Sequence, residues 1–412
     1  MGRPSRRGVV DAPIYAMHNP PLEGGGMAQR KLLVEGWRFL PHSFAIVNHW
    51  HLLALRRHPE IELRVRDLPV HFEGWQKATK DFSDAASLAL LQALPAPEPG
   101  FIPDTTLRFG YPFDLAPPIA GRLGVICPNE YHVFQQASWR QPIDSAALAA
   151  RDDLMVIAPS RWSAEGLCHI GIPQAKLRVV PHGVDSAVFA PDAASGAAMR
   201  RRLGLGPGMD NGVVFMNAGA MTVNKGADLL LRAFAELCRD RGDVYLLLKG
   251  TDELYRSNAR LGATLHGLEP RLRELIAPRM IYGGTTLSTA DMAALYRAAD
   301  VYVSPYRAEG FNLPVLEAMA SGLPVICTAG GSTDDFISDE AGLRIASRRE
   351  PAAMTDGTTG VHLQPDFDRL VAAMTQAASD AEWRRRAGAA ARAQAQRFTW
   401  DGAVDQLLQI LL

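Results

Sequence analysis

The chain has 412 residues, 47% of them hydrophobic and 21% charged, which is enough apolar material to exclude a mainly disordered protein. Its 43 basic and 44 acidic side chains leave a formal net charge of −1, which excludes a general electrostatic attraction to nucleic acid or to an anionic membrane. A chain of this length typically forms two or three domains, and any anionic ligand must be held by a local set of donors and cations.

The cysteines and the first residues limit the setting of the protein. The four cysteines are far apart and form no CxxC pair, which argues against a zinc ribbon or a redox dithiol and favours a reducing, cytoplasmic setting. Residues 1–26 are polar and rich in Gly, Pro and Arg, so we expect a flexible tail and no signal peptide. No run of about 18 apolar residues predicts a spanning helix.

Strands and helices are predicted to alternate after residue 27. Short aliphatic runs bounded by polar, Gly or Pro residues are typical of buried strands. We expect strands at 31–34, 61–65, 123–127 and 154–158, and a helix from Phe44 to about Arg57 with Ser43 as its N-cap. This order predicts a parallel sheet with helices on its faces.

A linker is expected after Asp185, where Pro, Ala, Gly and Ser dominate up to residue 210. The Gly-x-Gly at 204–206 lacks a preceding strand and a following helix, so it predicts no dinucleotide site. The alternation then restarts, with helices at 227–239 and 291–299, the second opened by Ser288 and Asp291. The expected strands are 213–216, 244–248, 280–282, 301–303 and 325–327.

Together these patterns predict an α/β protein made of two Rossmann-like domains that face each other across a ligand cleft. We expect residues 27–190 to form the first domain. Residues 191–397 would form the second domain. A last amphipathic helix at 398–412 is expected to complete the first.

The densest motif follows the expected strand 301–303. Its loop carries Glu309, and a helix is expected to start near Pro314, since proline suits a first helical turn. The N–H groups of Gly310, Phe311, Asn312 and Leu313 would then point out of a helix N-terminus and form an anion site that needs no net basic charge. Glu309 and Glu317 are poorly suited to bind the phosphate itself but can accept hydrogen bonds from sugar hydroxyls on either side.

This motif, EGFNLPVLEAMASGLPV at 309–325, resembles the retaining GT-B glycosyltransferases of family four, also called glycosyl transferases group 1. Their hallmark is a pair of glutamates with seven residues between them. Three further segments support the resemblance, which is good over about 150–412: VPHGVD at 180–185, DVYV at 300–303 and FTW at 398–400. The resemblance implies that Glu309 acts at the donor sugar, near its 3- and 4-hydroxyls. It also implies that Glu317 holds the nucleotide ribose and that the neighbouring residues 310–313 bind the donor.

A second family segment lies at 219–228. The family usually has a Gly-Arg pair followed five residues later by Lys-Gly, and the Arg and Lys clamp the donor phosphates. Lys225 matches the lysine, but Ala220 replaces the arginine. Lys249, at the end of the strand 244–248, is a candidate for the second charge, with an ordinary exposed lysine as the alternative.

The candidates on the acceptor side are less regular. Gly36 begins the first expected strand-to-helix loop, residues 36–43, where the family often has a Gly-Gly pair that is absent here. Relatives often carry a histidine after the strand 123–127; here Glu130 is the nearer candidate for a sugar or acceptor contact, and His132 is displaced and could be purely structural. The Trp37–Arg38–Phe39 run could support at most peripheral membrane contact.

No metal or cofactor is expected. The single Asp-x-Asp string, Asp366 to Asp368, precedes an amphipathic run and is predicted to start a helix. The donor would be a nucleotide-diphospho-sugar, with UDP- or GDP-sugar favoured over ADP-sugar; the base would be read near 282–286. The acceptor would be a glycan, lipid, protein or small molecule, and nucleic acid is not an expected partner.

The sequence therefore predicts a metal-independent glycosyltransferase that acts with retention by a front-face mechanism, since no side chain is an obvious nucleophile. Two alternatives remain open. One is a nucleotide-sugar epimerase of the same architecture; the other is an inactive GT-B scaffold that binds a glycan or a protein, which Ala220 and the missing histidine would favour.

Overall fold

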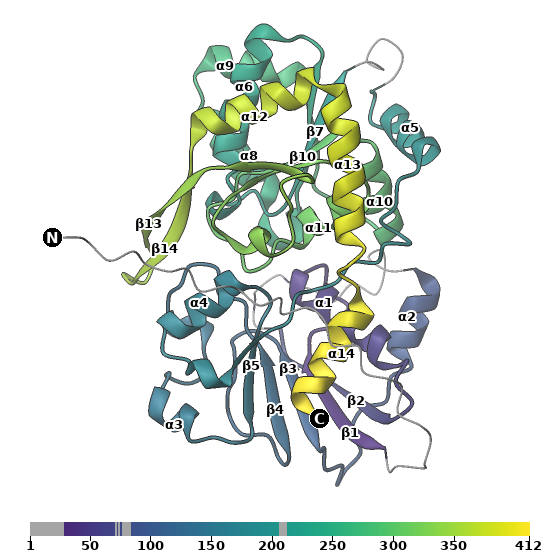
Figure 1. Cartoon of the computed structure of the whole chain (residues 1–412), viewed down its shortest axis with the longest axis vertical. Coiled ribbons are helices and arrows are strands. Elements are labelled where there is room, and N and C mark those ends of the chain that lie inside the picture. Colours follow the sequence, from purple (N-terminus) through teal and green to yellow (C-terminus); the bar gives the residue numbers. More distant parts are fainter. Residues whose placement is uncertain (1–28, 71, 73–74, 76–83, 206–211) are drawn as a thin grey trace, which may run out of the picture.

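The computed structural model describes residues 29–70, 72, 75, 84–205 and 212–412. The expected tail at 1–26 and most of the glycine-rich end of the expected linker lie outside these residues. Within them the strands form two six-stranded parallel sheets and one two-stranded antiparallel hairpin. Figure 1 shows the two sheets in separate halves of the molecule. The prediction of two Rossmann-like halves is confirmed.

The first sheet has the strand order β2-β1-β3-β4-β5-β6. Because the order reverses between β1 and β3, the loops that leave the carboxyl ends of these two strands separate and open a crevice. The strands are β1 (Arg30–Gly36), β2 (Ile61–Asp67), β3 (Thr105–Phe109), β4 (Arg122–Ile126), β5 (Leu154–Ala158) and β6 (Leu177–Val179). The α-helices of this half are α1 (Ser43–Leu55), α2 (Ala85–Gln92), α3 (Ser145–Ala149) and α4 (Arg161–His169).

The second sheet has the order β12-β11-β10-β7-β8-β9, with its reversal between β7 and β10. Its strands are β7 (Val213–Ala218), β8 (Val244–Lys249), β9 (Met280–Gly283), β10 (Val301–Ser304), β11 (Val325–Thr328) and β12 (Gly342–Ile345). The α-helices are α5 (Ala193–Arg202), α6 (Ala227–Asp240), α7 (Asp252–Tyr255), α8 (Ser257–His266), α9 (Pro270–Ile276), α10 (Thr289–Arg297), α11 (Leu313–Ala320), α12 (Phe367–Ser379) and α13 (Ala381–Ala395). Each face of the sheet has its own apolar core, with α10 and α11 in one and α6 and α12 in the other.

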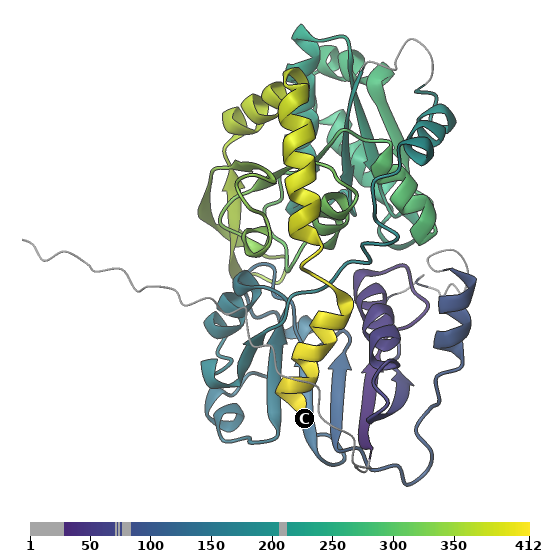
Figure 2. The ribbon, with the colours of Figure 1, turned by 45° about the vertical axis from the view of Figure 1, so that its right-hand side comes forward.

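The chain returns to the first half at its end. After α13, Thr399 caps α14 (Trp400–Leu411), and the apolar face of α14 joins the core formed by β1, β3 and α1. Figure 2 shows α13 lying along the second half and α14 along the first. Leu411 packs so closely on β4 that a Cβ added at Gly124 would lie 2.6 Å from its Cδ2. The chain therefore passes from the second half, at α13, back into the core of the first half, at α14.

Several elements differ from the sequence prediction. β3 was not predicted because Thr105, Thr106 and Arg108 break its apolar pattern; all three are buried, and Arg108 pairs with Glu35 at 2.8 Å. The short strand β6 was also not predicted. The expected linker contains α5, whose N-cap Asp192 accepts a hydrogen bond from the Ser195 amide. The hairpin of β13 (Ser347–Ala353) and β14 (Thr359–Pro365) was not predicted either.

Two local expectations are wrong. His42, not Ser43, caps α1, because its Nδ1 accepts a hydrogen bond from the Phe44 amide at 3.1 Å. Trp37 is 1% exposed and packs among Phe44, Phe72 and Trp75, so its side chain is not free to insert into a membrane. Across the described ranges, every helix is too short or too polar to cross a bilayer.

Candidate functional site

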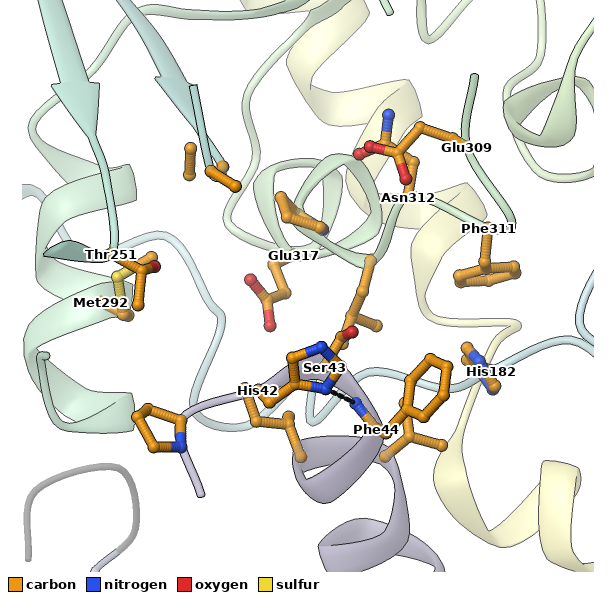
Figure 3. Close-up of a pocket in the computed structure, with 18 of the residues that line it drawn as sticks. His42, Ser43, Phe44, His182, Thr251, Met292, Glu309, Phe311, Asn312 and Glu317 are labelled. Atoms are coloured by element: carbon orange, nitrogen blue, oxygen red, sulfur yellow. Dashed lines mark hydrogen bonds between the residues drawn. The ribbon is translucent and has the colours of Figure 1, made fainter. Parts of the chain in front are cut away.

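A cavity of about 310 Å³ lies between the two halves, at the carboxyl ends of both sheets. The first half contributes the loop after β1, the first turns of α1, and residues after β4 and β5. The second half contributes the loops after β7, β8 and β10 and the start of α11. Figure 3 shows Glu309, Asn312 and Glu317 from the second half, with His42, Ser43 and Phe44 approaching from the start of α1.

The loop after β10 leads into a helix close to the position that the sequence predicts. α11 begins at Leu313, and its N-cap Asn312 has a φ of +76°, held by a hydrogen bond from Asn312 Nδ2 to Ser304 Oγ at 3.0 Å. Within the described residues, the amides of 310–313 donate to no protein acceptor. Buried amides are almost always paired, so these four are free for an anion at the helix N-terminus.

The first half fixes this loop in place. The carbonyl oxygen of Gly310 accepts hydrogen bonds from the hydroxyls of Ser160 and Ser163, at 2.6 and 3.0 Å. A Cβ added at Gly310 would lie 2.7 Å from Cβ of Pro128, so only glycine allows this approach. The motif therefore lies where the two halves meet.

Glu309 forms an ion pair with Lys225 inside the cavity. Lys225 Nζ donates to Glu309 Oε1 at 2.6 Å, and Glu309 is only 7% exposed. Burial raises the pKa of Glu309 to about 7, the Lys225 ammonium lowers it, and nearby Glu130 raises it. For Lys225, burial alone would lower the pKa, but Glu309 and Glu130 outweigh it and hold the pKa above its ordinary value. Lys225 is therefore a firmly charged ammonium between two acidic side chains.

Glu130 reaches this cluster from the first half, where it follows β4. Its Oε2 accepts a hydrogen bond from Asn224 Nδ2 at 3.1 Å, across the interface between the halves. Tyr255 of α7 lines the same cavity; burial raises its pKa to about 12, and Lys225, Glu130 and Glu309 are its charged neighbours. The acidic pair and the lysine thus form one cluster contributed by both halves.

Glu317 lies one turn into α11 and also lines the cavity. The hydroxyl of Tyr296, on α10, donates to Glu317 Oε2 at 2.8 Å. Burial raises the pKa of Glu317 to about 7, and the hydrogen bond from Tyr296 offsets part of that rise. A side chain held in this way is an oriented acceptor, as a ligand hydroxyl requires.

Replacing Glu317 with glutamine should remove part of the pH dependence of stability. A glutamate has a pKa near 4.5 when unfolded and about 7 here, so the folded state binds the proton more tightly and stability falls as pH rises from about 4.5 to 7. Between pH 5 and 8 the free energy of unfolding should fall by roughly 1–3 kcal/mol more in the parent than in Glu317→Gln. Urea unfolding of the ligand-free proteins measures this. Glu340→Gln, at an exposed position, is the control. If the free energy of unfolding changes equally with pH in Glu317→Gln and in the parent, the raised pKa of Glu317 is refuted.

Two further cavity side chains were not singled out by the sequence. Burial, and then the charge of Lys225, lowers the pKa of His42 to about 3, so its imidazole is neutral. The ring of His182 packs against Phe311 with centroids 4.9 Å apart, and burial lowers its pKa as well. The sequence signals that could have identified them are their positions: His42 lies at a helix start after β1, and His182 lies in the PHGVD segment.

Most of the predicted site residues converge on this cavity, but two do not. Its lining includes Lys225, Lys249, Glu130 and the whole of 309–313, together with Glu317. Gly36 lies outside the lining and packs against Asn48 and the Phe109 carbonyl. His132 also lies outside; its Nε2 is 2.9 Å from the Trp162 carbonyl oxygen, and it lines a separate groove beside α4 and the β13–β14 hairpin.

The Asp-x-Asp string lies at the start of a helix. Asp366 is the N-cap of α12 and accepts a hydrogen bond from the Arg369 amide, as predicted. Over the described ranges, no group of three or more His, Cys, Asp or Glu side chains could hold a metal ion.

Near the expected base-reading segment, Thr286 and Leu287 line the cavity, and the Tyr282 hydroxyl donates to Asp252 at 2.5 Å.

Comparison with known proteins places these features in a wider group. Residues 212–364 match the family model described as "Glycosyl transferases group 1". A D-inositol 3-phosphate glycosyltransferase of Xylanimonas cellulosilytica is 30% identical over 272 residues, which cover 65% of this chain and 58% of the relative. A GDP-mannose-dependent alpha-(1-6)-phosphatidylinositol monomannoside mannosyltransferase of Mycolicibacterium smegmatis is 27% identical over 312 residues, 67% of this chain and 76% of the relative. The chain spans little more than half the length of the first curated relatives it matches.

Solved structures show the same architecture over nearly the whole chain. Anabaena Alr3699/HepE, crystallised with UDP and glucose, superposes with a TM-score of 0.63 at 17% identity, covering 93% of this chain and 99% of that one. WaaG, a glycosyltransferase involved in lipopolysaccharide biosynthesis, gives a TM-score of 0.60 at 15% identity, with coverage of 92% and 99%. At such identities the likeness concerns the fold.

Proposed function

The chain is a GT-B-fold member of the glycosyl transferases group 1, and we propose that it transfers a sugar from a nucleotide-diphospho-sugar to an acceptor hydroxyl with retention at the anomeric carbon. We propose a UDP- or GDP-sugar as the donor. This choice is supported by a relative named as GDP-mannose-dependent and by structural neighbours crystallised with UDP.

One observation carries the proposal: free amides, a charged lysine, the buried Glu309 and the partly buried Glu317 line a single cavity between the halves. The amides of 310–313 suit the diphosphate, and Lys225 adds a positive charge beside them. Glu309 would accept hydrogen bonds from hydroxyls of the donor sugar. Glu317, oriented by Tyr296, would accept from the ribose.

The proposed mechanism relies on stabilising the leaving group. As the bond from the anomeric carbon to the phosphate oxygen breaks, negative charge grows on the diphosphate. The amides and Lys225 line the cavity in which that charge would develop, and donors and cations already held in place stabilise such a charge. The acceptor hydroxyl would attack from the same face and pass its proton to the departing phosphate, so no side chain needs to act as a nucleophile. We include no metal ion in this mechanism, because the amides and Lys225 can stabilise the charge of the leaving diphosphate.

We propose that the two halves bind different substrates. Residues 191–397 would bind the donor. Residues 27–190, completed by the helix 398–412, would bind the acceptor, and Glu130 of this half would contact the acceptor or the sugar. We propose that the enzyme acts in the cytoplasm, with at most peripheral contact to a membrane.

A thermal-shift screen against UDP-, GDP- and ADP-sugars tests this function without knowledge of the acceptor. A ligand that binds only the folded state raises the melting temperature by mass action. A UDP- or GDP-sugar at about 100 times its Kd should stabilise the protein by about 2.7 kcal/mol, and ADP-sugars by less. The matching free sugars are the control. If no nucleotide sugar shifts the melting temperature, the proposed function is wrong.

A further inference from the structure

Lys249 is a buried cation that pairs with no carboxylate of the described residues. It ends β8, is 7% exposed and lines the cavity. Its Nζ donates to the carbonyl oxygen of the next residue, Gly250. Among the described residues it forms no ion pair with a carboxylate. Burying an ammonium with so little compensation costs free energy, and the cost is recovered if an anion binds there.

The acidic groups nearest to Lys249 are engaged elsewhere. Burial lowers the pKa of Lys249, while Glu253 and Asp252, both on α7, raise it. Asp252 accepts hydrogen bonds from the Tyr282 hydroxyl at 2.5 Å and from the Asn258 amide at 2.7 Å. Glu253 accepts from the hydroxyl of Thr286. These carboxylates therefore shift the titration of Lys249 without pairing with it.

The position of Lys249 relates it to the missing arginine. β7 and β8 are paired in register, with Ala218 opposite Lys249, and the Gly219 amide donates to the Lys249 carbonyl at 2.9 Å. A Cβ added at Gly219 would lie 3.6 Å from Cγ of Lys225. The two lysines thus flank Gly219 and Ala220, at the loop where the family resemblance places an arginine.

The two lysines differ in how far their charge is already used. Lys225 is paired with Glu309 at 2.6 Å and has Glu130 as a second acidic neighbour. Lys249 has only a neutral carbonyl at its ammonium. An incoming diphosphate therefore gains more from Lys249, since binding Lys225 means sharing it with Glu309.

On this basis we propose that Lys249 is the main cation that binds the donor diphosphate and that it replaces the arginine absent at position 220. Lys225 is then shared between Glu309 and the leaving phosphate. This inference rests on the proposed function, because it assumes that a nucleoside diphosphate enters this cavity.

Calorimetric titration of UDP and GDP into the parent, Lys249→Met and Lys249→Met/Ala220→Arg tests the assignment. Lys249→Met should weaken binding of the nucleoside diphosphate that the parent prefers by about 10–100-fold, as expected for one lost charge-assisted contact. Affinity for the matching nucleoside, which lacks phosphates, should stay within about twofold. Adding Ala220→Arg should restore most of the diphosphate affinity. Lys31→Met, at an exposed site on β1, is the control.

The outcomes separate this inference from the proposed function. If the parent binds UDP or GDP and Lys249→Met binds it equally well, the role of Lys249 is refuted and the proposed function stands. Equal losses for nucleoside and nucleoside diphosphate would show a structural role and also refute it. So would a loss that Ala220→Arg does not repair. If the parent binds neither nucleoside diphosphate, the proposed function and this inference both fail.

Discussion

Replacing Glu309 with glutamine is expected to lower the rate of sugar transfer by about 10²–10³-fold while the protein remains folded. The amide has the size of the carboxylate, so the packing of the loop after β10 is kept. It loses the negative charge that pairs with Lys225 at 2.6 Å and halves the acceptor capacity available to sugar hydroxyls. The loss should appear in kcat more than in the affinity for nucleoside diphosphate, which Glu309 does not bind.

Release of nucleoside diphosphate from the donor, followed by a coupled assay, measures this effect. Glu382→Gln, at an exposed pair on α13, serves as the control and should behave as the parent does. A Glu309→Gln variant that releases nucleoside diphosphate at the parental rate would remove Glu309 from the proposed mechanism.

The second large effect is expected for Lys225→Met. Without the ammonium, an incoming diphosphate loses one cation, and at a pH high enough to ionise Glu309 the carboxylates of Glu309 and Glu130 would also repel it. Transfer efficiency, kcat/KM for the donor, should fall by about 10²–10³-fold. The pKa of Glu309 should also rise further above about 7, because the Lys225 charge now holds it down.

A double variant separates the lost attraction from the new repulsion. Lys225→Met/Glu309→Gln should bind nucleoside diphosphate more tightly than Lys225→Met alone, because one of the two opposing acidic groups is gone. Calorimetric titration of UDP and GDP measures both affinities, with Lys31→Met as the control. Binding by the double variant that is no tighter than by Lys225→Met would mean that the two residues do not act as a pair.

The part of the cavity formed by the second half could be predicted from the sequence because its signals are local. Pro314 and Asn312 mark a helix start, and the strand before them is short and fully buried, so the loop and its free amides follow from neighbouring residues. The topology then brings Lys225 to Glu309, because the β7 and β10 loops leave adjacent strands at the point where the sheet order reverses.

The first half could not be predicted to the same extent because its signals depend on tertiary contacts. His42 caps α1 through an imidazole nitrogen. Since Ser, Thr, Asp and Asn are the preferred N-cap residues, the sequence favours the neighbouring Ser43 instead. β3 was not predicted because the charge of Arg108 suggests an exposed position, whereas in the structure Arg108 is buried and paired with Glu35. Trp37, which resembles a surface aromatic, is buried by other aromatic residues that are distant in sequence.

The near-neutral charge of the chain agrees with the arrangement of the cavity. A diphosphate can be held there by four amides and two lysines, one paired with Glu309 and one unpaired, without a basic surface. The free energy of binding would come from groups already fixed in place by the fold, with little ordering on binding.

The most direct test of the central claim follows the donor by proton NMR in the absence of an added acceptor, with water as the slow acceptor. The account predicts release of nucleoside diphosphate from a UDP- or GDP-α-sugar, with the α-anomer of the same sugar formed first. It also predicts that Glu309→Gln loses this reaction. A β-anomer formed first would contradict retention, and a different sugar would indicate an epimerase. No release from any nucleotide sugar would favour a scaffold that only binds.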